Sequence, residues 1–167
     1  MAMLAMVGLD LAKNVLQAHG AAADGTVVFR KKLRREQVLR FFAEQPRCVV
    51  SMEACPGAHH RGRLIRDLDH EVRLIAPAYV KPFVKRQKND AADAEAIAKA
   101  AARPTMRFVP SKREEKQAAS TIFRTRDILV GQRTRLINAL RGHLSAYGVI
   151  APQGPSHVAR LIAGIED

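Results

Sequence analysis

Two short apolar runs that each end in an acidic residue place the strongest constraint on the fold of this chain. Leu4 to Leu9 is followed directly by Asp10, and the β-branched run from Arg47 to Met52 is followed by Glu53. Runs of this length and composition are typical of buried strands. A carboxylate at the end of a buried strand is costly unless it is paired or binds a cation. If the two strands are parallel neighbours, both carboxylates lie side by side at one edge of a sheet.

The segments around these runs predict a mixed sheet flanked by helices. Asn14 to His19 and Thr26 to Leu33 are strand-like, and Asp24-Gly25 between them is a hairpin signal. Helical patterns over 35–44, 58–68 and 90–102 then alternate with strand patterns over 47–52, 72–75 and 106–109. Three antiparallel strands, a helix, a parallel strand, a helix and another strand is the order of the ribonuclease H fold. We therefore predict an α/β, ribonuclease-H-like domain over residues 1–110.

The segment from Ser111 to Tyr147 predicts one long helix. Ser111 and Glu114 fit a capping box at its start. Apolar pairs recur every seven residues, at Ile122-Phe123, Leu129-Val130 and Leu136-Ile137. A sustained seven-residue period is typical of a coiled-coil-like helix that packs along its length. We expect a helical segment over 111–148 that mediates self-association.

Residues 149–167 differ from this helix in composition. Pro152, Gly154 and Pro155 interrupt the helical pattern, and Ser156 is a candidate cap for a new helix. We interpret this segment as a linker and the start of a truncated C-terminal domain.

Further carboxylates open the alanine-rich helix predicted over 90–102. Asp90 and Asp93 are three residues apart, which puts both on one helical face, whereas Glu95 is expected to be solvated. Acids at a helix start also favour the helix dipole, so capping alone is an alternative explanation. Four converging carboxylates, Asp10, Glu53, Asp90 and Asp93, would repel one another unless hard cations such as Mg²⁺ or Mn²⁺ hold them. Two such ions support phosphodiester cleavage.

The charge balance predicts a polyanionic partner, with nucleic acid as the first choice. The chain has 28 Lys and Arg against 16 Asp and Glu, a net charge of +12. A dense basic stretch just before Asp90 contains Lys81, Lys85, Arg86 and Lys88, interleaved with Tyr79 and Phe83. A second basic cluster covers residues 30–35, and the long helix carries Arg126 and Arg133 among the arginines opposite its apolar stripe. A solvated loop and a solvated helix face are the alternatives to phosphate contacts at these places.

Three motifs resemble those of the DEDD-type insertion-sequence transposases, a family that includes the Piv-type invertases. They are Gly8-Leu9-Asp10-Leu11-Ala12-Lys13, Met52-Glu53-Ala54-Cys55 and the segment KNDAADAEAI from Lys88 to Ile97. The segment from Gln132 to Tyr147 is similar to the helix that follows the catalytic domain in that family. The resemblance covers nearly the whole chain.

The resemblance implies a RuvC-like N-terminal domain of a DNA transposase or recombinase. Asp10, Glu53, Asp90 and Asp93 would be its catalytic, metal-binding tetrad, and Lys13, His59 and His60 would be candidate nucleic-acid contacts. Family members cut and exchange DNA strands, and several are guided by a structured non-coding RNA. They also have a second domain with a catalytic serine, which nothing in this chain matches, so we expect this chain to lack it.

Three rival interpretations remain open at this point. A RuvC-type Holliday-junction resolvase predicts the same metal site and basic surface. A fragment of an actin-like kinase would explain Gly8-Leu9-Asp10 but requires a second glycine-rich loop and a longer chain, and it fits poorly with a net charge of +12. A basic nucleic-acid-binding module without catalysis would use the acids only as caps.

The cysteine content and the apolar segments of the sequence predict where the protein is located in the cell. Two cysteines, Cys48 and Cys55, are too few for a disulfide framework. The apolar start runs directly into charged residues and no run approaches the ~18 apolar residues that span a membrane. We expect a cytoplasmic protein.

Overall fold

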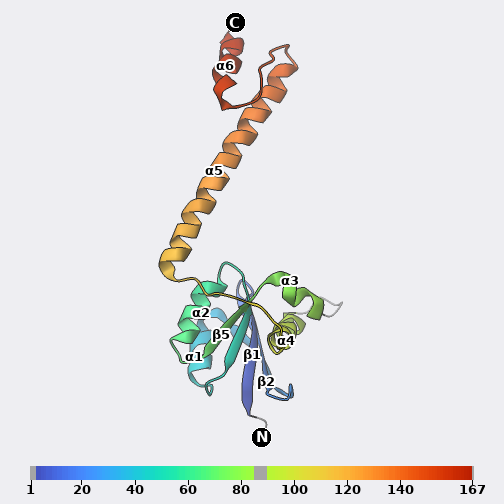
Figure 1. Ribbon diagram of the computed structural model, residues 1–167, viewed down its shortest axis with the longest axis vertical. Coiled ribbons are helices and arrows are strands. Elements are labelled where there is room, and N and C mark those ends of the chain that lie inside the picture. Colours follow the sequence, from blue (N-terminus) through green and yellow to red (C-terminus); the bar gives the residue numbers. More distant parts are fainter. Residues whose placement is uncertain (1–2, 85–89, 167) are drawn as a thin grey trace. The chain divides into compact units, whose positions relative to one another are not determined.

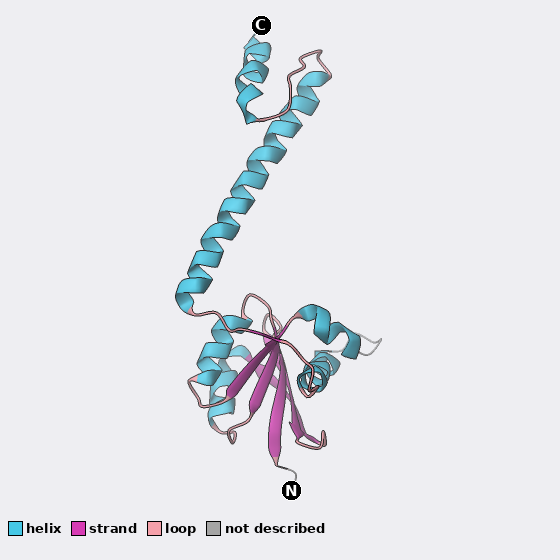
Figure 2. Ribbon diagram, viewed as in Figure 1, coloured by secondary structure: helices cyan, strands magenta, loops and turns pink. Residues whose placement is uncertain are grey.

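A computed structural model describes residues 3–84 and 90–166, with the backbone alone described at 90, 91 and 164–166. The chain forms two compact units, Met1–Arg113 and Glu114–Asp167, called unit 1 and unit 2 below. Their secondary structure is shown in Figures 1 and 2.

A six-stranded mixed sheet in the order β3-β2-β1-β4-β5-β6 forms the centre of unit 1 (Figure 2). The strands are β1 (Leu4–Asp10), β2 (Val15–Ala22), β3 (Val27–Arg34), β4 (Val49–Glu53), β5 (Glu71–Ile75) and β6 (Phe108–Val109). β1, β2 and β3 pair antiparallel, β4 and β5 continue the sheet parallel to β1, and β6 pairs antiparallel with β5. This order confirms the predicted ribonuclease-H-like, or RuvC-like, fold class.

The hairpin between β2 and β3 forms where Asp24-Gly25 predicted it. Gly25 has a φ of 87°, a conformation that glycine adopts without the steric cost of a Cβ. The Asp24 carboxylate accepts hydrogen bonds from both the amide and the hydroxyl of Thr26, each at 2.8 Å. These hydrogen bonds lower the pKa of Asp24.

Helices cover both faces of the sheet (Figure 1). The helices of unit 1 are η1 (Arg35–Gln37), α1 (Val38–Ala43), α2 (Ala58–Arg66), α3 (Pro77–Val80), η2 (Lys81–Phe83) and α4 (Asp90–Ala101). Leu9, Val50 and Met52 belong to the core cluster that contains the buried side of α1 and α2. Ile75 packs in a second cluster with α4. The two short helices α3 and η2 were not predicted, although Pro77 and Pro82 near their first residues are typical of helix starts.

A buried histidine ties together the elements on the α1 and α2 side. His70 Nδ1 accepts a hydrogen bond from the backbone amide of Cys48 at 3.3 Å, and its Nε2 lies 2.9 Å from the carbonyl oxygen of Phe42. The first contact makes Nε2 the protonated nitrogen, so it donates to Phe42. Burial raises the pKa of the neighbouring Cys48 thiol to about 11, so this thiol is un-ionised at neutral pH. His70 is therefore a satisfied core residue.

Unit 2 consists of α5 (Glu114–Ser145), η3 (Pro155–His157) and α6 (Val158–Glu166). The predicted long helix is confirmed, but the capping box at Ser111 is wrong because α5 begins three residues later. The backbone of Lys112 is held by α2: its amide donates to His59 Nδ1 at 3.2 Å and its carbonyl accepts from Arg63 at 2.8 Å. The Ser111 hydroxyl is buried without a hydrogen-bond partner in the described part of the chain.

Candidate metal and nucleic-acid site

The carboxyl ends of β1 and β4 lie at the same edge of the sheet. The last paired residues of these parallel strands are Leu9 and Met52, so Asp10 and Glu53 follow in the same register. Adjacent strands are about 4.8 Å apart. Both acids lie on the face covered by α4, because side chains alternate along a strand and Gly8, two residues before Asp10, lies against that helix.

Gly8 allows α4 to lie directly on the sheet. A Cβ at this position would overlap the carbonyl oxygen of Ala94 and would lie 2.7 Å from the amide nitrogen of Ala98. Both of these atoms are backbone, so neither can rotate away. Because α4 begins at Asp90, as predicted, this contact fixes how far the first turns of α4 lie from the edge that carries Asp10 and Glu53.

The structure brings Glu53 and Asp93 together. Partial burial raises the pKa of Glu53, and the nearby carboxylate of Asp93 raises it further. Asp93 is half-buried on α4, and Asp10 is half-buried at the end of β1. The mutual repulsion of two neighbouring carboxylates is relieved by a bound cation.

The fourth predicted ligand, Asp90, is described only in its backbone, at the first residue of α4. Among the residues whose side chains are described, no three His, Cys, Asp or Glu lie close enough together to hold a metal ion. Among the proposed ligands with described side chains, Glu53 and Asp93 therefore influence each other, and Asp10 follows the strand next to that of Glu53.

Glu95 is not solvated, so that prediction was wrong. Its side chain is only 14% exposed, and its carboxylate accepts from Lys99 at 2.6 Å and from Arg30 at 3.3 Å. The reason is that α4 lies across β1 and β2, which turns Glu95 towards His19 and the β3 strand. His19 is buried, and burial is the main cause of its lowered pKa. The basic cluster on β3 is thus partly used to neutralise Glu95.

The predicted nucleic-acid contacts fall in different parts of the chain. Exposed side chains are found at Lys13, His60, Lys81, Arg126 and Arg133. Lys85, Arg86 and Lys88 lie outside the described residues. Half-buried His59 accepts a hydrogen bond from the Lys112 amide at its Nδ1.

The aromatic residues of the basic stretch differ in their surroundings. Tyr79 is 47% exposed, whereas Phe83 packs against the α4 core. The guanidinium carbon of Arg103 lies 5.6 Å from the Phe83 ring centroid. Phe83 is therefore occupied by core packing, and Tyr79 is the more exposed ring of the two.

One basic residue near the carboxylate edge was missed in the sequence. Arg61 lies on α2, which follows Glu53, and burial together with the neighbouring positive charge of Arg35 lowers its pKa. Arg35 is itself fixed by a hydrogen bond from its Nε to the carbonyl oxygen of Lys13 at 3.2 Å. No motif pointed to this pair, because the two arginines come from separate elements, Arg35 from η1 and Arg61 from α2.

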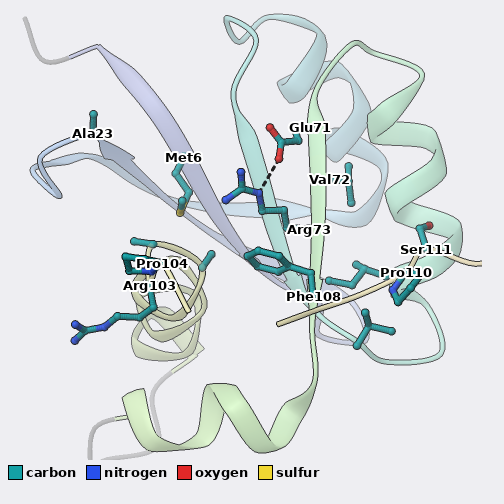
Figure 3. A pocket seen from close by; sticks show the side chains of 14 residues that line it. Met6, Ala23, Glu71, Val72, Arg73, Arg103, Pro104, Phe108, Pro110 and Ser111 are labelled. Atoms are coloured by element: carbon teal, nitrogen blue, oxygen red, sulfur yellow. Dashed lines mark hydrogen bonds and ion pairs between the residues drawn. The ribbon is translucent and has the colours of Figure 1, made fainter. Parts of the chain in front are cut away.

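A cavity of about 670 Å³ lies elsewhere in unit 1 (Figure 3). Figure 3 shows Arg73 on β5 paired with Glu71, at 2.7 Å, and Phe108 beside it. The cavity also reaches Arg103 and Pro104 after α4. None of the predicted carboxylate ligands lines it.

In the described residues, no helix has both the length and the hydropathy needed to cross a bilayer.

The strand order, with three antiparallel strands followed by two parallel ones, defines a ribonuclease-H-like fold. A family model for DEDD transposases of the IS110 type, described as "Transposase", matches residues 7–149. The chain belongs to this transposase family.

Curated proteins that are similar to this chain are also named transposases. The chain is 53% identical over 148 residues to a probable family 20 transposase of Pseudomonas aeruginosa, covering 89% of this chain and 44% of the relative. It is 45% identical over 159 residues to the putative transposase y4pF/y4sB of Sinorhizobium fredii, covering 95% of this chain and 41% of that one. It is 42% identical over 156 residues to the transposase for insertion sequence element IS1328 of Yersinia enterocolitica, covering 93% and 47%.

The chain thus spans less than half the length of the curated relatives it matches. Among solved structures, T. thermophilus RuvC in complex with a Holliday junction substrate matches with a TM-score of 0.49 and 14% identity, covering 64% of this chain and 99% of that chain.

Proposed function

We propose that this chain is the metal-dependent part of an insertion-sequence transposase that cleaves and exchanges DNA strands. The observation that carries the proposal is that Asp10 and Glu53 follow neighbouring parallel strands at one edge of a ribonuclease-H-like sheet, with the charge of Asp93 near enough to raise the pKa of Glu53. Acidic clusters at this edge suit phosphodiester chemistry, because hard cations bind carboxylate oxygens and phosphate oxygens together.

The proposed ligands of Mg²⁺ or Mn²⁺, with two ions expected, are Asp10, Glu53, Asp90 and Asp93. The fit of these residues to a cation is supported by their carboxylate oxygens, and by the pKa of Glu53, which burial raises first and the charge of Asp93 raises further, since a bound cation would favour the ionised form. When bound, such ions polarise phosphate oxygens and activate a hydroxyl nucleophile. The chain's own contribution is to hold the carboxylates on two strands and a helix, with Gly8 setting the distance of the helix.

DNA is the proposed substrate, and a structured guide RNA is the proposed second nucleic-acid partner. Support for both comes from membership of the transposase family and from the net charge of +12. The proposed contacts near the site are Lys13, His59, His60 and Lys81, together with Lys85, Arg86 and Lys88, and those on α5 are Arg126 and Arg133. We place this activity in the cytoplasm.

Self-association through α5 is proposed from its exposed apolar side chains. Ile122, Phe123, Leu129 and Leu136 are each at least 59% exposed, although large apolar side chains normally become buried. Their seven-residue spacing is that of a coiled-coil seam.

The deciding experiment is calorimetric titration of Mn²⁺ and Mg²⁺, with and without a DNA duplex. Wild type is compared with an Asp10→Asn, Asp93→Asn double variant, and an Asp127→Asn variant on α5 serves as the control for loss of an acid away from the site. We expect the wild type and the control to bind metal and the double variant to lose binding. Metal binding that is equal in all three, or absent in all three even with DNA, would reduce the chain to a basic nucleic-acid-binding module.

A further inference from the structure

A second cavity, of about 260 Å³, lies in unit 2 between one face of α5 and the turn that follows this helix. The α5 residues that line it are Arg133, Thr134, Ile137, Asn138 and Arg141, and residues 153–155 close its other side. Spacings of one, four, five and eight place the α5 residues on one helical face. A water molecule occupies roughly 30 Å³ in the liquid, so the cavity can hold a small anion with part of its hydration.

Arg141 is held in a fixed orientation at this cavity. Its Nη2 donates a hydrogen bond to the carbonyl oxygen of buried Ala151 at 3.0 Å. Its Nε is buried and has no hydrogen-bond partner within the described residues. Burying an N–H group without an acceptor is unfavourable, and more so when the group is charged. The guanidinium is therefore oriented beside the cavity by one contact, and its Nε–H is left unsatisfied within the described residues.

The remaining lining residues favour an anion as the ligand of this cavity. None of them is acidic, and the sequence has no Asp or Glu between Asp127 and Glu166. Over the described part of the chain, neither Arg133 nor Arg141 forms an ion pair with a carboxylate. The Thr134 hydroxyl donates to the Val130 carbonyl at 2.9 Å, so the amides of Asn138 and Gln153 are the neutral donors that remain.

We propose that this cavity binds a phosphate group of a nucleic-acid backbone through the guanidinium groups of Arg133 and Arg141. A planar guanidinium presents parallel N–H donors that match two phosphate oxygens. The identification of the anion as a phosphodiester rests on the proposed function, in which nucleic acid is the partner. Both DNA and RNA carry this group, so the experiment includes both.

The site itself is tested by following the arginine Nε–H signals of the full chain by NMR while inorganic phosphate is added. We expect one signal, absent in an Arg141→Lys variant, to shift with saturation, and the shift to weaken in Arg133→Gln. Arg135→Gln is the matched control, since it removes the same charge two residues away and Arg135 does not line the cavity. An Arg141 signal that shifts no more than the other arginine signals would overturn the proposal.

The nucleic-acid assignment is tested by anisotropy titrations of single-stranded DNA, duplex DNA and RNA over a range of salt concentrations. We expect Arg133→Gln and Arg141→Lys each to weaken binding about tenfold, the loss of a hydrogen bond to a charged group. The salt slope of Arg133→Gln should fall by about 0.7 for single strands and 0.9 for a duplex. A loss of affinity for DNA alone, or for RNA alone, identifies which nucleic acid supplies the phosphate.

An equal loss of affinity in Arg135→Gln would contradict the proposal, because it would show that binding depends only on the overall positive charge of the helix. Metal titration of Arg133→Gln separates this proposal from the proposed function. We expect metal binding at the carboxylates of unit 1 to be unchanged in this variant. If the carboxylates of unit 1 bind no metal, phosphate binding at this cavity can still be measured. If the cavity binds no phosphate, metal binding in unit 1 can still be measured.

Discussion

Glu53 carries a charge that the fold disfavours at neutral pH. Its pKa is raised by partial burial and then by Asp93, so the folded protein binds a proton at this residue more readily than the unfolded chain does. For an acid shifted upward, the stabilising contribution is complete below the unfolded pKa, near 4.5, and is lost as pH rises through the folded pKa. At neutral pH, Glu53 therefore lowers the free energy of unfolding.

We predict that Glu53→Gln stabilises the metal-free protein at pH 7 by roughly 0.5 kcal/mol, the usual size of a partly solvated charge interaction. Urea unfolding at pH 7 and pH 4 measures this, and the gain should vanish at the lower pH. Adding Mn²⁺ should raise the Tm of the wild type but not that of the variant. Glu36→Gln on η1, which is exposed, is the control. A variant that is less stable than wild type at pH 7 would show that Glu53 is not strained by its neighbours.

The individual acids differ in how far they could be predicted. Asp10 and Glu53 were predictable because each ends an apolar run, and parallel pairing follows from the order of the segments. Glu95 was placed wrongly, because helical spacing shows which residues share a face but not which strand lies opposite. The neighbour that determines its environment, Arg30, is 65 residues away in the sequence.

At the scale of elements, the contact between β1 and α4 controls the site. Gly8→Ala would push a methyl group into the backbone of α4 at Ala94 and Ala98. We predict a loss of stability of about 1–3 kcal/mol, typical of overpacking, together with weaker Mn²⁺ binding because Asp93 moves away from Glu53. Gly142→Ala on α5, where an added Cβ meets nothing, should instead stabilise by up to about 1 kcal/mol. Calorimetry and urea unfolding measure both effects, and unchanged metal affinity in Gly8→Ala would contradict the role assigned to this contact.

The apolar stripe of α5 leads to a prediction about association. No described residue of α5 is buried within the chain, yet its stripe has the spacing of a helix that packs along its length. We predict that wild type sediments as an oligomer and that a Leu129→Ser, Leu136→Ser double variant sediments as a monomer with unchanged helix content. Thr121→Ser, an exposed and polar change on the same helix, is the control. A wild type that stays monomeric at high concentration would refute self-association.

At the scale of the whole molecule, sequence patterns identified the large elements and missed the connections. The long helix and the individual strands follow from periodicity, which depends on the residues within one segment, and the fold class follows from the order of these elements along the chain. The start of α5 could not be predicted in this way, because His59 and Arg63 on α2 hold the Lys112 backbone in place. The short helices α3 and η2 were missed for a related reason, since Val80 and Phe83 are ordered by packing against α4.

Both core clusters that involve the sheet consist of residues from 4 to 109, entirely within unit 1. We therefore predict that a fragment ending at Arg113 folds alone, unfolds cooperatively in urea, and binds Mn²⁺ with the affinity of the full chain. It should lose the oligomeric state and the phosphate site of unit 2, because both depend on α5. Far-ultraviolet circular dichroism and calorimetry measure folding and metal affinity, with the Asp10→Asn fragment as control. A fragment that folds but binds no metal, while the full chain does, would show that unit 2 or a second copy completes the carboxylate site.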